Sequence, residues 1–110
     1  MICVSPDELA TIIAILKAHV PFCEVRAFGS RQKRTNRDYS DLDLAVVGSE
    51  KLPRSLMADL REAFMESELP YRVDLVDYHG VSKAFQAIID ASNEIVFNGA
   101  GLAPPPFSST

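Results

Sequence analysis

Two aspartates stand one residue apart at the end of the segment FGSRQKRTNRDYSDLDL, which covers residues 28–44. They begin an apolar run, DLDLAVVG, that Gly48 closes and that is typical of a buried strand. Side chains alternate between the two faces of a strand, so Asp41 and Asp43 are expected on the same side. At about 4 Å and an effective dielectric of roughly 20, two such charges repel by roughly 4 kcal/mol. A carboxylate pair is tolerated there when a cation occupies it or when one acid stays protonated.

A third acid stands in the later run YRVDLVDY, residues 71–78. Its alternation puts Asp74 on the face opposite Val73 and Leu75, so three carboxylates converge if the two strands are neighbours. Hard oxygen ligands in small number suit Mg²⁺, which takes its remaining ligands from water and substrate phosphates. We therefore predict a divalent-cation site at Asp41, Asp43 and Asp74. Asp77 has the other parity, and we predict that it is a turn residue.

Gly29 and Ser30 precede the aspartates and are separated from them by ten residues. A glycine after a strand permits close approach of the backbone, and the following serine can begin a short helix whose N–H groups favour an anion. A phosphate site at one end and a phosphate-bridging metal at the other describe a site for a nucleoside triphosphate. The segment between them carries a cluster of basic residues, which are Arg31, Lys33, Arg34 and Arg37. Such a cluster usually belongs to a solvated loop, and the alternative is that it contacts a nucleotide or a partner.

The bulk composition indicates one ordinary globular domain. The chain has 110 residues, 47% of them hydrophobic, and a formal net charge of −4. The acidic balance argues against a nucleic-acid or anionic-membrane partner. No apolar run is long enough for a bilayer span and no secretory signal begins the chain, so a cytoplasmic protein is expected. Cys3 and Cys23 lack metal-type spacing and are expected to be free, buried thiols.

Periodicity and end signals predict the order helix–strand–strand–helix–strand–helix. We expect helices from Pro6 to about His19, from Pro53 to before Pro70, and after Ser82, with strands at 24–28, 41–48 and 71–78. The last helix should carry Phe85, Ile88 and Ile89 inward, and the run EIVF after it is ambiguous between strand and helix end. The fold class is α/β, a small mixed sheet with helices packed on one face. Residues 1–98 form the domain, and the Pro-rich residues 99–110 form a flexible tail.

The combined motif resembles the DNA polymerase β-like nucleotidyltransferase superfamily, and within it the minimal nucleotidyltransferases. That pattern is a Gly-Ser, a spacer, Asp-x-Asp and a third acid on a later strand, here GSRQKRTNRDYSDLDL followed by YRVDLVDY. The resemblance implies that Gly29 and Ser30 hold the triphosphate, that Asp41 and Asp43 bind two Mg²⁺ ions, and that Asp74 shares an ion and helps activate an acceptor hydroxyl. Many relatives have glycine where Arg34 stands, so this loop departs from the family pattern at that position.

The resemblance implies transfer of a nucleoside monophosphate, usually AMP from ATP, with release of pyrophosphate. It is specifically to small bacterial proteins encoded beside an all-helical HEPN or substrate-binding subunit. The sheet and its helices leave no residues for the second wall of an acceptor cleft, so we expect a hetero-oligomer with such a partner. The chain is then an antitoxin that adenylylates a HEPN toxin, or it modifies a small molecule bound by the partner. The non-enzymatic alternative is a subunit that only caps its partner.

Overall fold

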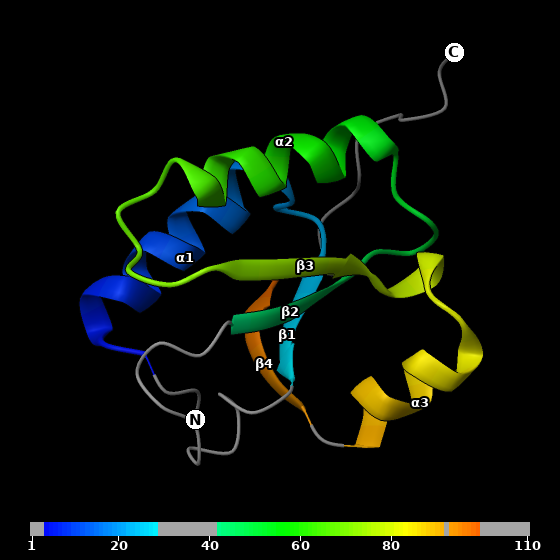
Figure 1. The fold of residues 1–110 in the computed structure, drawn as a ribbon. Helices are drawn as coiled ribbons and strands as arrows, with labels where there is room; N and C mark the ends of the chain where they lie inside the picture. The colour runs from blue at the N-terminus through cyan, green and yellow to red at the C-terminus, as the bar shows by residue number, and fades with distance from the viewer. Residues whose placement is uncertain (1–3, 29–41, 92, 100–110) are drawn as a thin grey trace.

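The fold is an α/β arrangement of four strands and three α-helices in the described part of the chain (Figure 1). The computed structural model describes residues 4–28, 42–91 and 93–99. In chain order the elements are α1 (Pro6–His19), β1 (Glu24–Phe28), β2 (Leu42–Val47), α2 (Arg54–Met65), β3 (Val73–Asp77), the short 3₁₀ helix η2 (Tyr78–Gly80), α3 (Lys83–Ala91) and β4 (Asn93–Asn98). The predicted element order is confirmed, and the ambiguous EIVF run lies in strand β4.

The strands form one mixed sheet in the order β3-β2-β1-β4. Strand β1 is antiparallel to both of its neighbours, β2 and β4, whereas β2 and β3 are parallel. Parallel neighbours need a crossover, and α2 supplies it between β2 and β3. The predicted fold class, a small mixed sheet with packed helices, is confirmed.

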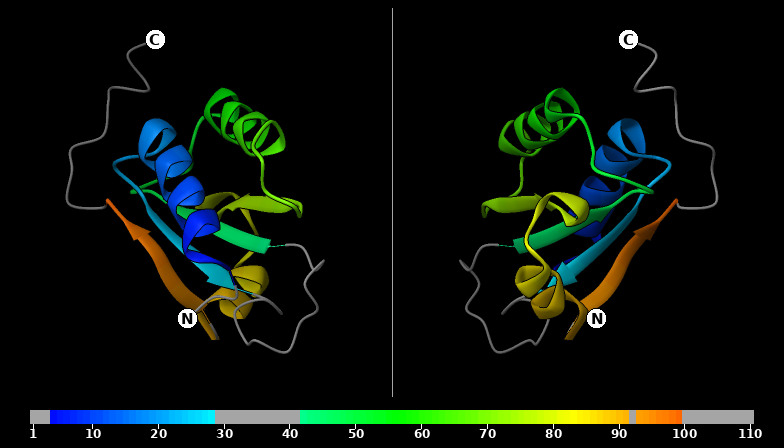
Figure 2. Two further views of the ribbon diagram at one scale, coloured as in Figure 1. Left: turned by 90° about the vertical axis from the view of Figure 1, so that its left-hand side faces the viewer. Right: turned by 90° about the vertical axis from the view of Figure 1, so that its right-hand side faces the viewer.

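Helices α1 and α2 cover one face of the sheet, as the two side views in Figure 2 show. The main core lies between them and the strands, because alternate strand residues point toward the helices. Ile12 and Leu16 of α1, Leu60 of α2 and Leu44 of β2 are fully buried in it. Leu42 and Val46 share the parity of Leu44 and are buried as well, so the facing predicted for β2 is correct.

Helix α3 packs against the opposite face, so the expectation of helices on one face holds for α1 and α2 but not for α3. A second, smaller cluster joins Phe28, Ala45 and Ile89, with Phe85 packed against it. The rings of Phe28 and Phe85 meet edge to face at 5.9 Å between centroids. Ile88 was expected inward but is 63% exposed, because each residue turns the helix by roughly 100° and Ile89 takes the inward position.

The helix ends largely follow the sequence signals. Ser5 and Glu8 form a reciprocal capping box, with both backbone-to-side-chain hydrogen bonds at 3.1 Å. Pro53 is the N-cap of α2 and not its first helical residue, a shift of one position. Ser82 accepts a hydrogen bond from the N–H of Phe85 at the start of α3. Among the described helices, none has the length and apolar character that a bilayer crossing requires.

The C-terminal end of the described chain closes against the start of β1. Gly99, assigned to the tail in the sequence-based prediction, is buried, and its N–H donates to the carbonyl of Cys23 at 2.9 Å. The rest of the predicted tail, residues 100–110, lies outside the described residues.

Candidate functional site

Two of the three predicted site acids lie next to each other in the sheet. Asp43 of β2 and Asp74 of β3 are direct register partners in the parallel pair. Partners in register point to the same side, here the face opposite α1 and α2, and neighbouring strands run about 4.8 Å apart. Asp43 is half-buried and Asp74 is exposed. The strand pairing on which the convergence of these acids depended is therefore present.

The other predicted site residues lie outside the described residues. These are Gly29, Ser30 and Asp41, together with the basic cluster of Arg31, Lys33, Arg34 and Arg37. The strand ends that flank them are well defined. Phe28, the last residue of β1, is the register partner of Asp43. Leu42 begins β2, and its N–H donates to the carbonyl of Arg72 at 2.9 Å. The chain thus leaves β1 and enters β2 at the same end of the sheet as the two acids.

The two described acids are ligands of the kind that a hard divalent cation takes. Asp43 and Asp74 offer carboxylate oxygens from adjacent strands, which are the ligands that Mg²⁺ prefers. Within the described residues, no group of three or more His, Cys, Asp and Glu side chains could hold a metal ion. The third predicted ligand, Asp41, lies outside the described residues. The two described acids therefore make up part of the predicted ligand set.

Asp77 has a structural role on the other side of β3, as its parity predicted. Its Oδ2 accepts a hydrogen bond from the N–H of Leu52 at 2.8 Å, and its Oδ1 accepts one from the N–H of His79 at 3.2 Å. Asp77 is the N-cap of η2, so the prediction of a turn residue is confirmed. The bond to Leu52 crosses 25 positions of sequence and had no local signal.

Sequence reasoning missed a polar group on the face of the sheet opposite α1 and α2. We call this the open face, and α3 covers only part of it. Arg26 of β1 lies two residues before Phe28 and so on the same face, and its guanidinium pairs with Glu24 at 2.6 Å. Asp90 of α3 lies 4.0 Å from Arg26 and accepts hydrogen bonds from the hydroxyl of Tyr78 at 2.9 and 3.0 Å. This hydrogen bond raises the pKa of the Tyr78 phenol above its ordinary value. Only the period-2 alternation of EVRAF could have placed Arg26 on this face.

Two other potentially reactive side chains are accounted for structurally. Cys23 is free and fully buried, and burial together with the charge of Asp77 raises its pKa to about 11. A thiol with that pKa is protonated at neutral pH and is therefore a poor nucleophile. The predicted free, buried thiol is thus confirmed for Cys23, while Cys3 lies outside the described residues. Nε2 of His79 lies 2.9 Å from the carbonyl oxygen of Gly48 and holds a loop.

Comparison with known proteins agrees with this architecture. Residues 10–100 match the protein family described as "Polymerase beta, Nucleotidyltransferase". A curated relative from Haemophilus influenzae, "Probable protein adenylyltransferase MntA", is 46% identical over 86 residues, which cover 78% of this chain and 75% of the relative.

Solved structures give the same picture. A crystal structure of "the toxin-antitoxin with AMP-PNP" superposes with a TM-score of 0.69 at 26% identity, covering 81% of this chain and 72% of that one. A structure of a tri-AMPylated Shewanella oneidensis HEPN toxin in complex with MNT antitoxin superposes with a TM-score of 0.62 at 23% identity, covering 81% and 68% of the two chains. The second likeness shows the fold alone.

Proposed function

Because this chain belongs to the polymerase β nucleotidyltransferase family, and is thereby a nucleotidyltransferase, we propose that it transfers AMP from ATP to a hydroxyl of a protein partner. The observation that carries the proposal is the register pairing of Asp43 with Asp74 on the face opposite α1 and α2. Two carboxylates from different strands on one face are what a metal-assisted phosphoryl transfer requires of the protein.

Each acid has a distinct role in the proposed reaction. Asp43 near the start of β2 would hold the metal ions together with Asp41. Asp74 would be the third ligand and would accept the proton of the attacking hydroxyl. When bound, two Mg²⁺ ions supply charge neutralisation at the attacking and leaving oxygens of the in-line displacement. Gly29 and Ser30 would hold the triphosphate.

The rigidity of the sheet explains how the two described acids stay in position. Asp43 lies in the β2 register between β1 and β3, and the flanking residues Leu42 and Leu44 are fully buried. Fixed carboxylates lower the barrier through positioning and preorganised charge, because they need not reorganise during the reaction. Asp43 and Asp74 therefore act as a preformed part of the site.

The proposed partner is a helical HEPN-type subunit, with which the chain forms a hetero-oligomer. The structure of the toxin-antitoxin with AMP-PNP supports both a partner subunit and an adenine nucleotide, since it is 26% identical to this chain and covers most of it. The adenylyltransferase relative supports AMP as the transferred group and a protein as the acceptor. The chain then acts as an antitoxin that modifies its toxin.

The test is transfer of label from α-labelled ATP in the presence of Mg²⁺ and the HEPN-type partner. We expect label on the partner polypeptide, and a loss of about 10²–10⁴-fold in rate for Asp43→Asn and Asp74→Asn. Asp59→Asn, a change of the same charge at an exposed position on α2, is the matched control and should transfer normally.

The other outcomes separate the alternatives. Label on a small molecule and not on the partner would show that the protein acceptor is wrong. Unchanged transfer by the double variant, Asp43→Asn with Asp74→Asn, would refute catalysis at this site. Rescue of partner toxicity by that double variant without any transfer would show a capping subunit.

A further inference from the structure

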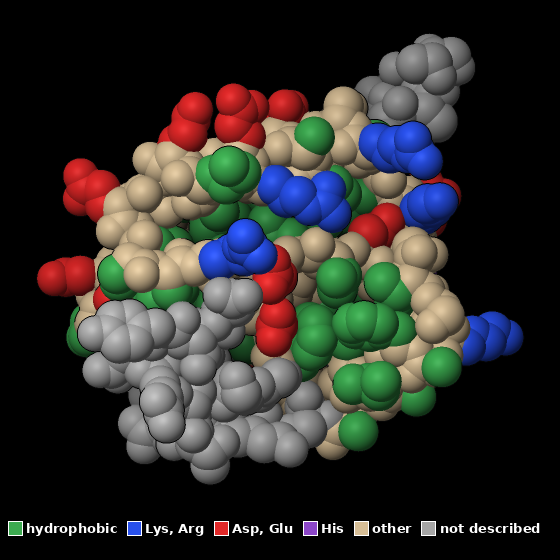
Figure 3. All heavy atoms as spheres, in the orientation of Figure 1, with side chains coloured by type: hydrophobic (Ala, Val, Ile, Leu, Met, Phe, Trp, Pro, Cys, Tyr) green, Lys and Arg blue, Asp and Glu red, His purple; other side chains and the backbone are tan. Residues whose placement is uncertain are grey.

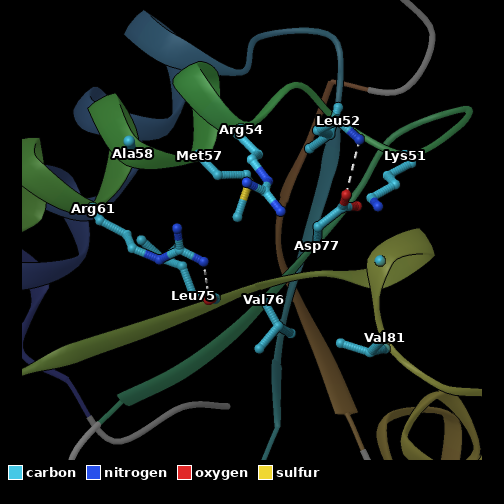
Figure 4. A pocket seen from close by; sticks show the side chains of 11 residues that line it. Lys51, Leu52, Arg54, Met57, Ala58, Arg61, Leu75, Val76, Asp77 and Val81 are labelled. Carbon is cyan, nitrogen blue, oxygen red and sulfur yellow. Dashed lines mark hydrogen bonds between the residues drawn. The ribbon is translucent and has the colours of Figure 1, made fainter.

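A cleft opens beside the edge strand β3, between β3 and helix α2 (Figure 4). Its volume is about 490 Å³. We call it the cationic cleft, and it is lined by Lys51, Leu52, Arg54, Met57, Ala58, Arg61, Leu75, Val76, Asp77, Gly80 and Val81. It lies mainly on the side of β3 that faces α2, and Val76, which shares the face of Asp74, completes its lining at the strand edge. The residues proposed above for the transfer reaction do not line it.

The charge of the cleft is opposite to that of the chain. Lys51, Arg54 and Arg61 are exposed around it, whereas the protein as a whole carries −4. In the described part of the chain, none of these three cations forms an ion pair. Asp77, the one carboxylate among the described lining residues, already accepts hydrogen bonds from two backbone N–H groups. The cleft is therefore a local positive site in an acidic protein.

One of the cations is held in place over the edge of the sheet. Nη2 of Arg61 donates to the carbonyl oxygen of Leu75 at 3.3 Å, which positions the guanidinium beside β3 (Figure 4). A guanidinium carries five N–H donors in a fixed fork that matches a carboxylate. Most of these donors remain available to a ligand, and the planar group is already oriented before the ligand binds.

The floor of the cleft is apolar. Leu52, Met57 and Leu75 line it and are only 4–5% exposed, so they form a firm surface that belongs to the main core. Figure 3 shows green side chains in the hollow between α2 and β3, with blue side chains along its rim. An inorganic anion would use the rim and leave the floor empty. Among the described residues, no aromatic side chain lines the cleft, so they provide no platform on which a nucleic-acid base could stack. The combination fits an acidic peptide segment that carries an apolar side chain.

The position of the cleft relates it to the acid pair. Asp74 points to the open face of β3, whereas its neighbour Leu75 lines the cleft. The two sites thus lie on the two sides of one edge strand, and a segment lying across that edge contacts both. We propose that the cationic cleft binds an acidic, apolar-anchored segment of the protein acceptor, with its carboxylates on Arg54 and Arg61, and so brings the acceptor hydroxyl to Asp43 and Asp74. The assignment of the acceptor rests on the proposed function.

The test measures binding of the HEPN-type partner in the Asp43→Asn, Asp74→Asn background, where no transfer is needed. We expect Arg54→Glu with Arg61→Glu to weaken the dissociation constant at least about 10-fold, as interfacial arginines commonly do. The matched control is Lys17→Glu with Lys83→Glu, the same charge change at exposed positions on α1 and α3, with unchanged affinity expected. Ala58→Trp tests the cleft without a charge change, because Ala58 is exposed on α2 and lines the cleft, so the indole would occupy the space of the bound segment.

The kinetic readout uses the chain with its acids intact. The two arginine substitutions should raise KM for the partner about 10-fold and leave KM for ATP unchanged. Equal affinity and equal KM in folded cleft variants would overturn the inference while leaving the proposed function standing. Weakened binding without any transfer by the unsubstituted chain would support the cleft as a docking site and refute the proposed reaction. If the control pair weakens binding as much as the arginine pair, the effect is one of net charge and the cleft is refuted.

Discussion

The strongest prediction separates two aspartates that stand three residues apart on the same strand. Asp74 belongs to the open face and Asp77 to the helix-covered face, so their substitutions should have opposite effects on stability and transfer. Replacing Asp77 by alanine removes the acceptor of the Leu52 N–H at 2.8 Å and of the His79 N–H at 3.2 Å. Leu52 is only 5% exposed, so its N–H would be left without a partner and with little access to water.

The expected magnitude follows from these two bonds. An unsatisfied buried donor costs about 1–3 kcal/mol, and the loss of an N-cap costs about 0.5–2 kcal/mol. We expect Asp77→Ala to lower the free energy of unfolding by about 2–3 kcal/mol. In a domain of this size, that loss lowers Tm by about 8–20 °C. Asp77→Asn keeps one acceptor oxygen and should lose about half as much.

Asp74→Ala should do the reverse. Asp74 is exposed, and none of the described residues gives it a hydrogen-bond or ion-pair partner, so its stability should change by less than about 0.5 kcal/mol. Transfer should fall about 10²–10⁴-fold. The assay is thermal unfolding by circular dichroism, combined with the labelled-ATP assay at a temperature where every variant is folded. If Asp77→Ala abolishes transfer and keeps its Tm, the assignment of the third acid by strand parity is wrong.

Three further predictions concern the end of the sheet where Cys23 lies. In a Cys3→Ser background, Cys23 should react with iodoacetamide at neutral pH about 100-fold more slowly in the native protein than in denaturant, because its pKa is raised to about 11 and it is buried. The raised pKa of Cys23 favours the folded state below pH 9.0, by about 2–3 kcal/mol. This contribution is lost as the pH rises from 9.0 to about 11. The free energy of unfolding of Cys23→Ala should therefore fall less steeply than that of the unsubstituted chain in this pH range. Gly99→Ala should lower the free energy of unfolding by about 1–3 kcal/mol, since its Cβ would lie 1.8 Å from the carbonyl oxygen of Pro21; an unchanged denaturation midpoint would contradict this close approach.

Prediction from the sequence succeeded where the signal is local. The Ser5 capping box and the 3.6-residue spacing of Ile12 and Leu16 specified α1 from Pro6 to His19. The period-2 pattern of LDLAVV specified which side chains of β2 face the core, and therefore the side to which Asp43 points. The family was also predictable, because the order Gly-Ser, Asp-x-Asp and a later acid is readable along the chain, and the family match over residues 10–100 confirms it. The predicted nucleotide and metal roles stay predictions.

Other features needed the folded chain. The sequence analysis could only assume that β2 and β3 are neighbours. The tertiary structure shows that they pair, which brings Asp43 beside Asp74. The same holds for the packing of α3 on the second face, for the outward position of Ile88 and for the Asp77–Leu52 hydrogen bond. The cationic cleft likewise had no sequence signature, since its cations come from α2 and the loop before it, and its floor is completed by β3.

The physical reason for this division is the range of the interactions. Caps, helical spacing and strand alternation depend on residues a few positions apart, so the amino-acid sequence by itself determined α1, the facing of β2 and the motif of acids. Which elements become neighbours depends on how apolar faces bury one another across the whole domain. Only the tertiary structure therefore decided that acids 31 positions apart lie side by side on one face of the sheet, and that cations gather beside strand β3.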